Sequence, residues 1–182
     1  RAMKVFRTLP VAHRPEAAAF VGDRSAVVTT DSAGELLAWP LAGGEPPLRL
    51  QLGEECSPRQ LWPEPGARRL ALLCKDGGLL WLDLDAPDAL RELARPTGKV
   101  LHTFVPNRNA LVYGTSEGEL WISEGPGGPP RLLAQYSYPI LALAAVPDRP
   151  EIVFSADDLV VRRSLDGGEL TRYPGHPLQV GS

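Results

Sequence analysis

A short glycine-led segment recurs along the chain, and this repeat limits the possible fold more than any other feature. The recurring segments are GELLAWPL (34–41), GLLWLDL (78–84) and GELWISE (118–124). Their opening glycines, Gly34, Gly77 and Gly118, are 43 and 41 residues apart, and a fourth turn at Asp157-Asp158 follows about 40 residues later. Such a regular interval indicates that one supersecondary unit is repeated.

Two other kinds of turn keep the same interval. Residue–proline pairs precede three of the four units and follow the last one: Arg14-Pro15, Ser57-Pro58, Tyr138-Pro139 and His176-Pro177. Short segments rich in Gly, Pro, Asp and Asn separate the first two apolar runs of each unit, as in Gly22-Asp23-Arg24 and Pro147-Asp148-Arg149. These residue types favour β-turns. We therefore expect units over residues 15–52, 58–94, 99–137 and 139–174.

Each unit contains four short apolar runs, with the second and third runs the most apolar. The fourth runs carry more Arg and Glu, which is typical of an exposed edge strand. Four antiparallel strands in a repeat of about 40 residues predict a β-propeller blade. The expected fold is therefore an all-β propeller of which about four blades are present.

Composition agrees with short strands and excludes several classes of protein. Among 182 residues there are 18 Gly and 19 Pro, which leaves little room for long helices. The hydrophobic share of 43% is enough for a core, and the net charge is −3 with no basic run. We therefore expect no nucleic acid as partner. No apolar run is long enough to predict a membrane span.

The two ends of the chain are out of step with a closed four-bladed ring. Residues 3–9 align with the fourth strands, and residues 177–180 align with the first strands. Together with the start at Arg1, this predicts a piece of a larger propeller, of roughly seven or eight blades. An eight-bladed ring of two copies and a four-bladed ring with a surplus strand are the alternatives. Exposed blade faces would then promote self-association or require the rest of the protein.

The third run of each unit resembles a WD-repeat. Trp39 and Leu41 occupy the Trp and Leu positions of that family, although Pro40 replaces its Asp. Asp76-Gly77 matches the family's opening turn, and the Gly-His dipeptide appears at Gly175-His176 and, less clearly, at Ala12-His13. Quinoprotein-like and NHL-type propellers are alternatives, because degenerate repeats of different propeller families have similar sequence patterns.

This resemblance implies structural roles for four residues: His13, Trp39, Asp76 and His176. In WD-repeats the His joins a hydrogen-bond network with a Ser or Thr, an Asp and the Trp. His13 would accordingly reach Trp39 with help from Thr30 or Asp31. The resemblance also implies a protein or peptide partner, because most WD-repeat proteins present rigid loops to other proteins.

No sequence motif indicates catalysis, a cofactor or a metal. The phosphate-binding, dinucleotide-binding and Gly-x-Ser-x-Gly motifs are absent. Cys56 and Cys74 are 18 residues apart and are too few for a disulfide scaffold, so we expect Cys74 to be a free, buried thiol in a reducing cytoplasm. His102 lies among apolar residues and is expected to be a core histidine.

Residues that precede or begin the first run of each unit are the candidates for ligand contact: Arg14, Arg59, Lys99 and Tyr138. They would lie near the central axis on one face. The function we expect is a non-catalytic protein-interaction scaffold or a sensor module of a larger protein. The richness in Ala, Arg, Pro and Gly indicates a bacterial source. The alternatives are an enzyme supported by a propeller, hydrolase or quinoprotein-like, and a propeller that binds a small molecule or sugar.

Overall fold

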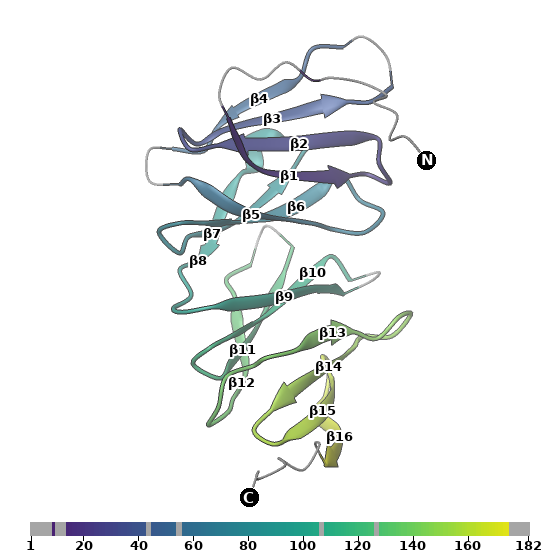
Figure 1. Ribbon diagram of the computed structural model, residues 1–182. Coiled ribbons are helices and arrows are strands. Elements are labelled where there is room, and N and C mark those ends of the chain that lie inside the picture. The colour runs from purple at the N-terminus through teal and green to yellow at the C-terminus, as the bar shows by residue number, and fades with distance from the viewer. Residues whose placement is uncertain are drawn as a thin grey trace, which may run out of the picture. The chain divides into compact units, whose positions relative to one another are not determined.

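The computed structural model describes residues 9, 14–42, 45–53, 56–105, 108–125 and 128–174. The chain divides into two compact units, Arg1–Glu92 and Leu93–Ser182, which are described separately. Strands form four separate four-stranded antiparallel sheets, and in each the strands lie in sequence order (Figure 1). The predicted all-β fold with four four-stranded blades is therefore confirmed.

The first blade consists of β1 (Pro15–Val21), β2 (Ala26–Asp31), β3 (Glu35–Pro40) and β4 (Leu48–Gln51). The second consists of β5 (Pro58–Pro63), β6 (Arg69–Cys74), β7 (Leu79–Asp83) and β8 (Arg91–Ala94), with the 3-10 helix η1 (Pro87–Ala89) before β8. The third consists of β9 (Val100–Val105), β10 (Ala110–Thr115), β11 (Glu119–Glu124) and β12 (Arg131–Gln135). The fourth consists of β13 (Leu143–Ala145), β14 (Glu151–Ala156), β15 (Leu159–Ser164) and β16 (Glu169–Pro174). Of the predicted end strands, 3–9 and 177–180, all but Leu9 lies outside the described residues.

The repeated glycines occur where the second strand of a blade turns into the third. Gly34 and Gly118 have φ angles of 77° and 81°, in the left-handed region that favours glycine. A side chain closes each of these turns. The Asp31 carboxylate accepts hydrogen bonds from the amides of Ala33 and Glu35, both over 2.9 Å. The glycine repeat is therefore a repeat of one turn conformation.

Each unit has its own hydrophobic core between its blades. In the first unit the core contains Val28, Leu36, Leu70 and Leu82, all fully buried. In the second unit it contains the residues Val112, Leu120, Ile152, Phe154 and Val161. Every residue of β10 is buried and all but the first of β6 are, whereas the outer strands β4 and β12 are largely exposed or half-buried. Burial on both faces explains why the second and third runs are the most apolar.

The prediction that Cys74 is a free thiol is wrong, because Cys56 and Cys74 form a disulfide with Cα atoms 5.1 Å apart. Cys56 lies just before β5, and Cys74 ends the neighbouring antiparallel strand β6. The hairpin therefore brings together two cysteines that are 18 residues apart in sequence. All cysteines of the chain are accounted for by this bond.

Candidate functional site

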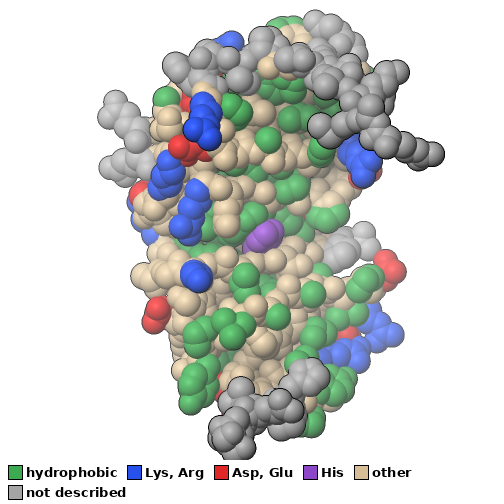
Figure 2. Space-filling view, in the orientation of Figure 1, with side chains coloured by type: hydrophobic (Ala, Val, Ile, Leu, Met, Phe, Trp, Pro, Cys, Tyr) green, Lys and Arg blue, Asp and Glu red, His purple; other side chains and the backbone are tan. Residues whose placement is uncertain are grey.

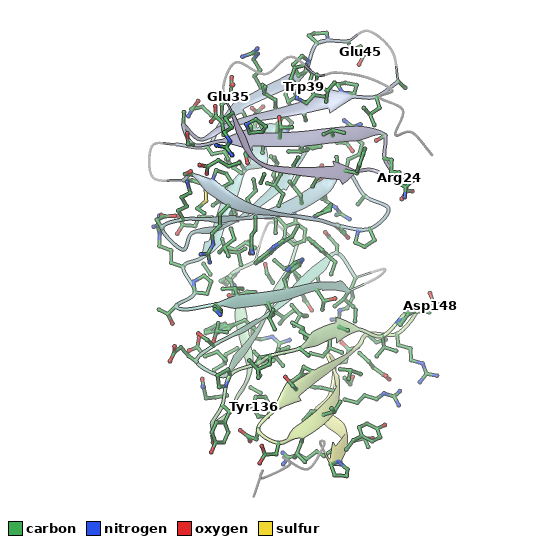
Figure 3. The ribbon with its side chains drawn as sticks, viewed as in Figure 1. Arg24, Glu35, Trp39, Glu45, Tyr136 and Asp148 are labelled. Carbon is green, nitrogen blue, oxygen red and sulfur yellow. A yellow bond between two sulfur atoms is a disulfide. The ribbon has the colours of Figure 1, made fainter. Side chains whose placement is uncertain are left out.

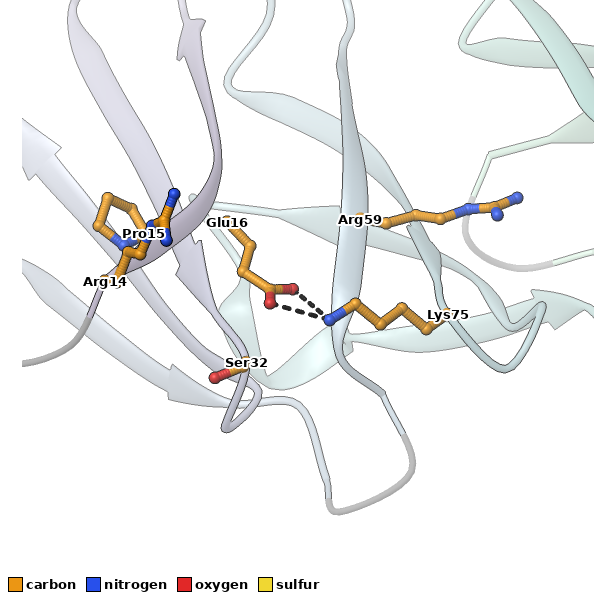
Figure 4. A pocket seen from close by; sticks show the side chains of 6 residues that line it. All are labelled: Arg14, Pro15, Glu16, Ser32, Arg59 and Lys75. Carbon is orange, nitrogen blue, oxygen red and sulfur yellow. Dashed lines mark hydrogen bonds and ion pairs between the residues drawn. The ribbon is translucent and has the colours of Figure 1, made fainter.

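The first unit has an open groove at the ends where β1 and β5 begin (Figure 4). Its volume is about 460 Å³. Six residues from neighbouring blades line it: Arg14, Pro15, Glu16, Ser32, Arg59 and Lys75. On the face seen in Figure 2, Lys and Arg side chains gather at the left margin of the first unit, where Figure 1 places the starts of these strands. The groove is therefore an open recess between two blades with four charged residues in its lining.

Two β-bulges shape the groove. The register of β1 on β2 shifts between Pro15 and Ala17, so Glu16 is the unpaired residue. The register of β5 on β6 shifts between Pro58 and Gln60, which leaves Arg59 unpaired at the equivalent position. A bulge redirects the side chain of its extra residue, and bulges are common next to binding sites. The equivalent strands β9 and β13 pair without any shift.

An ion pair between the blades crosses the centre of the groove. Lys75 Nζ lies 2.6 Å from Glu16 Oε2 and donates a hydrogen bond to Oε1 over 2.9 Å. The hydroxyl of Ser57 donates a longer hydrogen bond to Oε2, 3.4 Å away. The side chains of Glu16 and Lys75 remain 30% and 52% exposed, so water screens their attraction. The hydrogen bonds hold the ion pair in place, and its exposure leaves both charged groups accessible to another ion.

Arg14 and Arg59 flank this ion pair. Figure 4 shows Arg14 to one side of the Glu16–Lys75 pair and Arg59 extending away on the other. Both residues are exposed, and no hydrogen bond or ion pair joins either guanidinium to another side chain within the described part of the chain. The lining residues together carry three positive charges and one negative charge, a net charge of +2. The groove is thus a local basic site on an acidic chain.

The four predicted contact residues separate between the two units. Arg14 and Arg59 both line the groove, as expected for residues at the start of neighbouring first strands. Lys99 and Tyr138 belong to the second unit. The amide of Lys99 donates to the hydroxyl of Ser116, and Tyr138 is 62% exposed before β13. Ligand contact remains a prediction for all four residues.

Sequence reasoning missed Glu16, Ser32 and Lys75. Ser32 and Lys75 directly precede Ala33-Gly34 and Asp76-Gly77, the turns that the repeat identified. Their equivalent positions in the repeat were a signal that could have found them. Glu16 is the repeat equivalent of Arg59, 43 residues before it, so the same signal could have found it. The bulges at these two residues could not have been predicted, because a bulge leaves no mark in the alternation of a short strand.

Trp39, labelled in Figure 3, lies on β3 and forms a buried hydrogen bond within the first blade. Its indole nitrogen donates to the hydroxyl of Thr29 over 3.2 Å, not to either of the two residues that the WD resemblance implied. Asp31 closes the next turn instead, and Thr30 Oγ1 is buried with no hydrogen-bond partner in the described residues. His13 and His176, the other members of the implied set, lie outside the described residues.

Asp76 precedes Gly77 in the second blade as Ala33 precedes Gly34 in the first, and Cys74 takes the position of Asp31. The carboxylate of Asp76 accepts a hydrogen bond from the amide of Gly78 over 3.2 Å. This is a local turn of the kind that Asp side chains commonly form.

His102 lies half-buried on β9, with its ring edge-on to Phe104 at a centroid distance of 6.4 Å. Burial lowers its pKa to about 4, so the imidazole is neutral at pH 7. With so low a pKa, it is a weak proton acceptor.

The described residues contain neither a metal-binding cluster nor a membrane-spanning helix. No group of three or more His, Cys, Asp or Glu side chains in those residues could hold a metal ion. No helix among them is long and apolar enough to cross a membrane.

Comparison with known proteins places the chain by its fold. No known protein family and no curated protein matches its sequence. Its structure is similar to that of the dihydro-heme d1 dehydrogenase NirN in complex with DHE (TM-score 0.63, 17% identity) and to that of U3-55K (TM-score 0.61, 15% identity). The alignments include 90% and 92% of this chain.

These similarities show that the chain has a β-propeller fold. It spans 38% of the matched NirN chain and 54% of the matched U3-55K chain. At such low identity, the likeness extends to the fold alone.

Proposed function

We propose that this chain is a non-catalytic protein-interaction module that belongs to a larger propeller, as a scaffold or sensor in a multidomain bacterial protein. One observation carries the proposal: Glu16 and Arg59, the bulged residues of two neighbouring first strands, line one open groove together with Arg14 and Lys75. The similarity to propeller chains about twice as long supports the larger assembly.

The groove suits an extended polypeptide. It is open to solvent and is lined by long charged side chains, so a partner can enter without any rearrangement of the blades. The side chains of Arg14 and Arg59 are exposed and lack ion-pair partners among the described residues. Arginine is enriched among the residues that contribute most to protein interfaces.

The test is selection of peptides from an unbiased displayed library on the purified chain. We expect the selected peptides to bind the wild type and to lose at least about tenfold in affinity with the double variant Arg14→Ala/Arg59→Ala. The matched control is Arg49→Ala/Arg131→Ala, which removes the same charge from exposed residues outside the groove. Peptides that bind both double variants equally well, or no selected peptides at all, would contradict the proposal.

The cytoplasmic location expected from the low cysteine count stays a prediction. The Cys56–Cys74 disulfide argues against it, because such bonds persist mainly in oxidising compartments. Acid trapping of thiols in the native host, followed by mass spectrometry of the peptides that contain the two cysteines, measures the oxidised fraction directly. A fully reduced pair would support the cytoplasm, and a fully oxidised pair would contradict it.

A further inference from the structure

We infer that the groove recognises an acidic polypeptide segment, whose carboxylates bind Arg14 and Arg59 and displace Glu16 from Lys75. The inference rests on the proposed function and specifies the chemistry of the partner. In the free protein, Glu16 then occupies the position that a carboxylate of the partner takes in the complex.

The groove already binds one carboxylate. The ammonium of Lys75 contacts both oxygens of Glu16, and the hydroxyl of Ser57 reaches one of them. The amide of Lys75 in turn donates to the carbonyl of Ser57 over 2.9 Å, so the backbone fixes the two donors relative to each other. The same two groups would donate hydrogen bonds to the carboxylate of an incoming Asp or Glu side chain.

Glu16 can leave without loss of blade structure. As the extra residue of a bulge, it has no place in the register of β1 on β2. Its ion pair with Lys75 is partly exposed, and such pairs contribute little to stability. A segment that brings several carboxylates can therefore compete with a single tethered one.

Arg14 and Arg59 supply the remaining attraction. A guanidinium matches the two oxygens of a carboxylate and binds them with parallel hydrogen bonds. The two guanidiniums lie on either side of Lys75 (Figure 4), so the three cations could bind neighbouring acidic residues of an extended chain. With Glu16 displaced, the lining residues carry three positive charges and face no negative charge of their own.

The experiment measures binding of three fluorescent peptides of equal length by anisotropy in low salt. One carries four glutamates, the second carries glutamines in their place, and the third carries two phosphoserines among glutamines. We expect the glutamate peptide to bind, the glutamine peptide not to bind, and binding to weaken as NaCl is raised. If the phosphoserine peptide bound and the glutamate peptide did not, carboxylate recognition would be excluded.

The decisive variant is Glu16→Gln, which frees Lys75 without changing side-chain size. It should tighten binding of the glutamate peptide about two- to fivefold. Glu35→Gln is the matched control: Glu35 forms a similar exposed pair with Arg49, 2.8 Å apart, and does not line the groove. Arg14→Ala/Arg59→Ala should weaken binding about tenfold.

Equal affinities of Glu16→Gln and Glu35→Gln, or equal binding of the glutamate and glutamine peptides, would overturn the inference. Its failure can be told apart from that of the proposed function. Groove-dependent peptides without acidic residues, selected from the unbiased library, would leave the interaction module standing and remove only the acidic partner.

Discussion

The indole nitrogen of Trp39 donates a hydrogen bond to the hydroxyl of Thr29, 3.2 Å away, and both side chains are at least nine-tenths buried. The bond joins β2 to β3 across the blade interior. Thr29→Val keeps the shape of the side chain but leaves the indole N–H without its acceptor. We expect the free energy of unfolding to fall by about 1–3 kcal/mol, the cost of a buried donor without a partner. Urea denaturation followed by tryptophan fluorescence measures it.

Trp121 provides the control, because its indole donates to Glu119 over 3.1 Å at a partly exposed position on β11. Water can replace that acceptor. Glu119→Ala should therefore cost less than about 1 kcal/mol. Equal losses in the two variants would show that the Thr29 bond has no special weight.

The disulfide stabilises the second blade by reducing the conformational freedom of the unfolded chain. A link across 18 residues is expected to contribute about 3 kcal/mol. The double variant Cys56→Ala/Cys74→Ala should lower the free energy of unfolding by about that amount, and reduction of the wild type should have a similar effect. Denaturation with and without reductant tests this. A reductant effect that persisted in the double variant would point to a cause other than the disulfide.

The repeat predicted the blades well because turns must recur wherever strands do. Gly34 and Gly118 adopt the same left-handed conformation in equivalent turns of two blades. The buried strands β6 and β10 correspond to the most apolar runs. These features are local, so the sequence records them directly.

The groove and the disulfide were harder to predict because they depend on register. Cys56 and Cys74 meet only when β5 and β6 pair, and a bulge decides where Glu16 points. The hydrogen bond from Trp39 reaches Thr29 and not Thr30 for a similar reason, because adjacent residues of a strand face opposite sides of the sheet. A pattern of residue types does not fix any of these relationships.

His102 should make stability depend on pH. Its folded-state pKa of about 4 lies below the ordinary value of 6.5, so the unfolded chain takes up a proton first as the pH falls. The contribution of neutral His102 to the free energy of unfolding is complete above pH 6.5 and is lost as the pH falls from there towards 4. Allowing for partial exposure, we expect a loss of about 1–2 kcal/mol between pH 7.5 and pH 5.

The measurement compares unfolding of the wild type and His102→Gln at the two pH values. The variant should lose less stability than the wild type on going to pH 5. A titration of the His102 ring by NMR gives the pKa itself, and a midpoint near 6.5 would contradict the buried, neutral state.

The ion pair of the groove should contribute little to folding. Glu16 and Lys75 are both partly exposed, so we expect Glu16→Gln and Lys75→Ala each to change the free energy of unfolding by less than about 1 kcal/mol. Urea denaturation tests this before any binding assay. A loss above about 2 kcal/mol would mean that the pair supports the blades and that these variants cannot report on binding alone.

Gly118 should tolerate no side chain, for two separate reasons. Its φ of 81° is costly for other residues, and an added Cβ would lie 2.4 Å from the carbonyl oxygen of Tyr136 and 2.8 Å from that of Tyr138. Gly53 has a similar φ of 94° but has open space around the position of a Cβ. Gly53→Ala therefore reports the conformational cost alone, about 1 kcal/mol, whereas Gly118→Ala should cost about 2 kcal/mol more because backbone has to move. Thermal unfolding of the two variants separates the conformational cost from the steric cost. Equal losses of stability would show that the backbone around Gly118 moves at little cost.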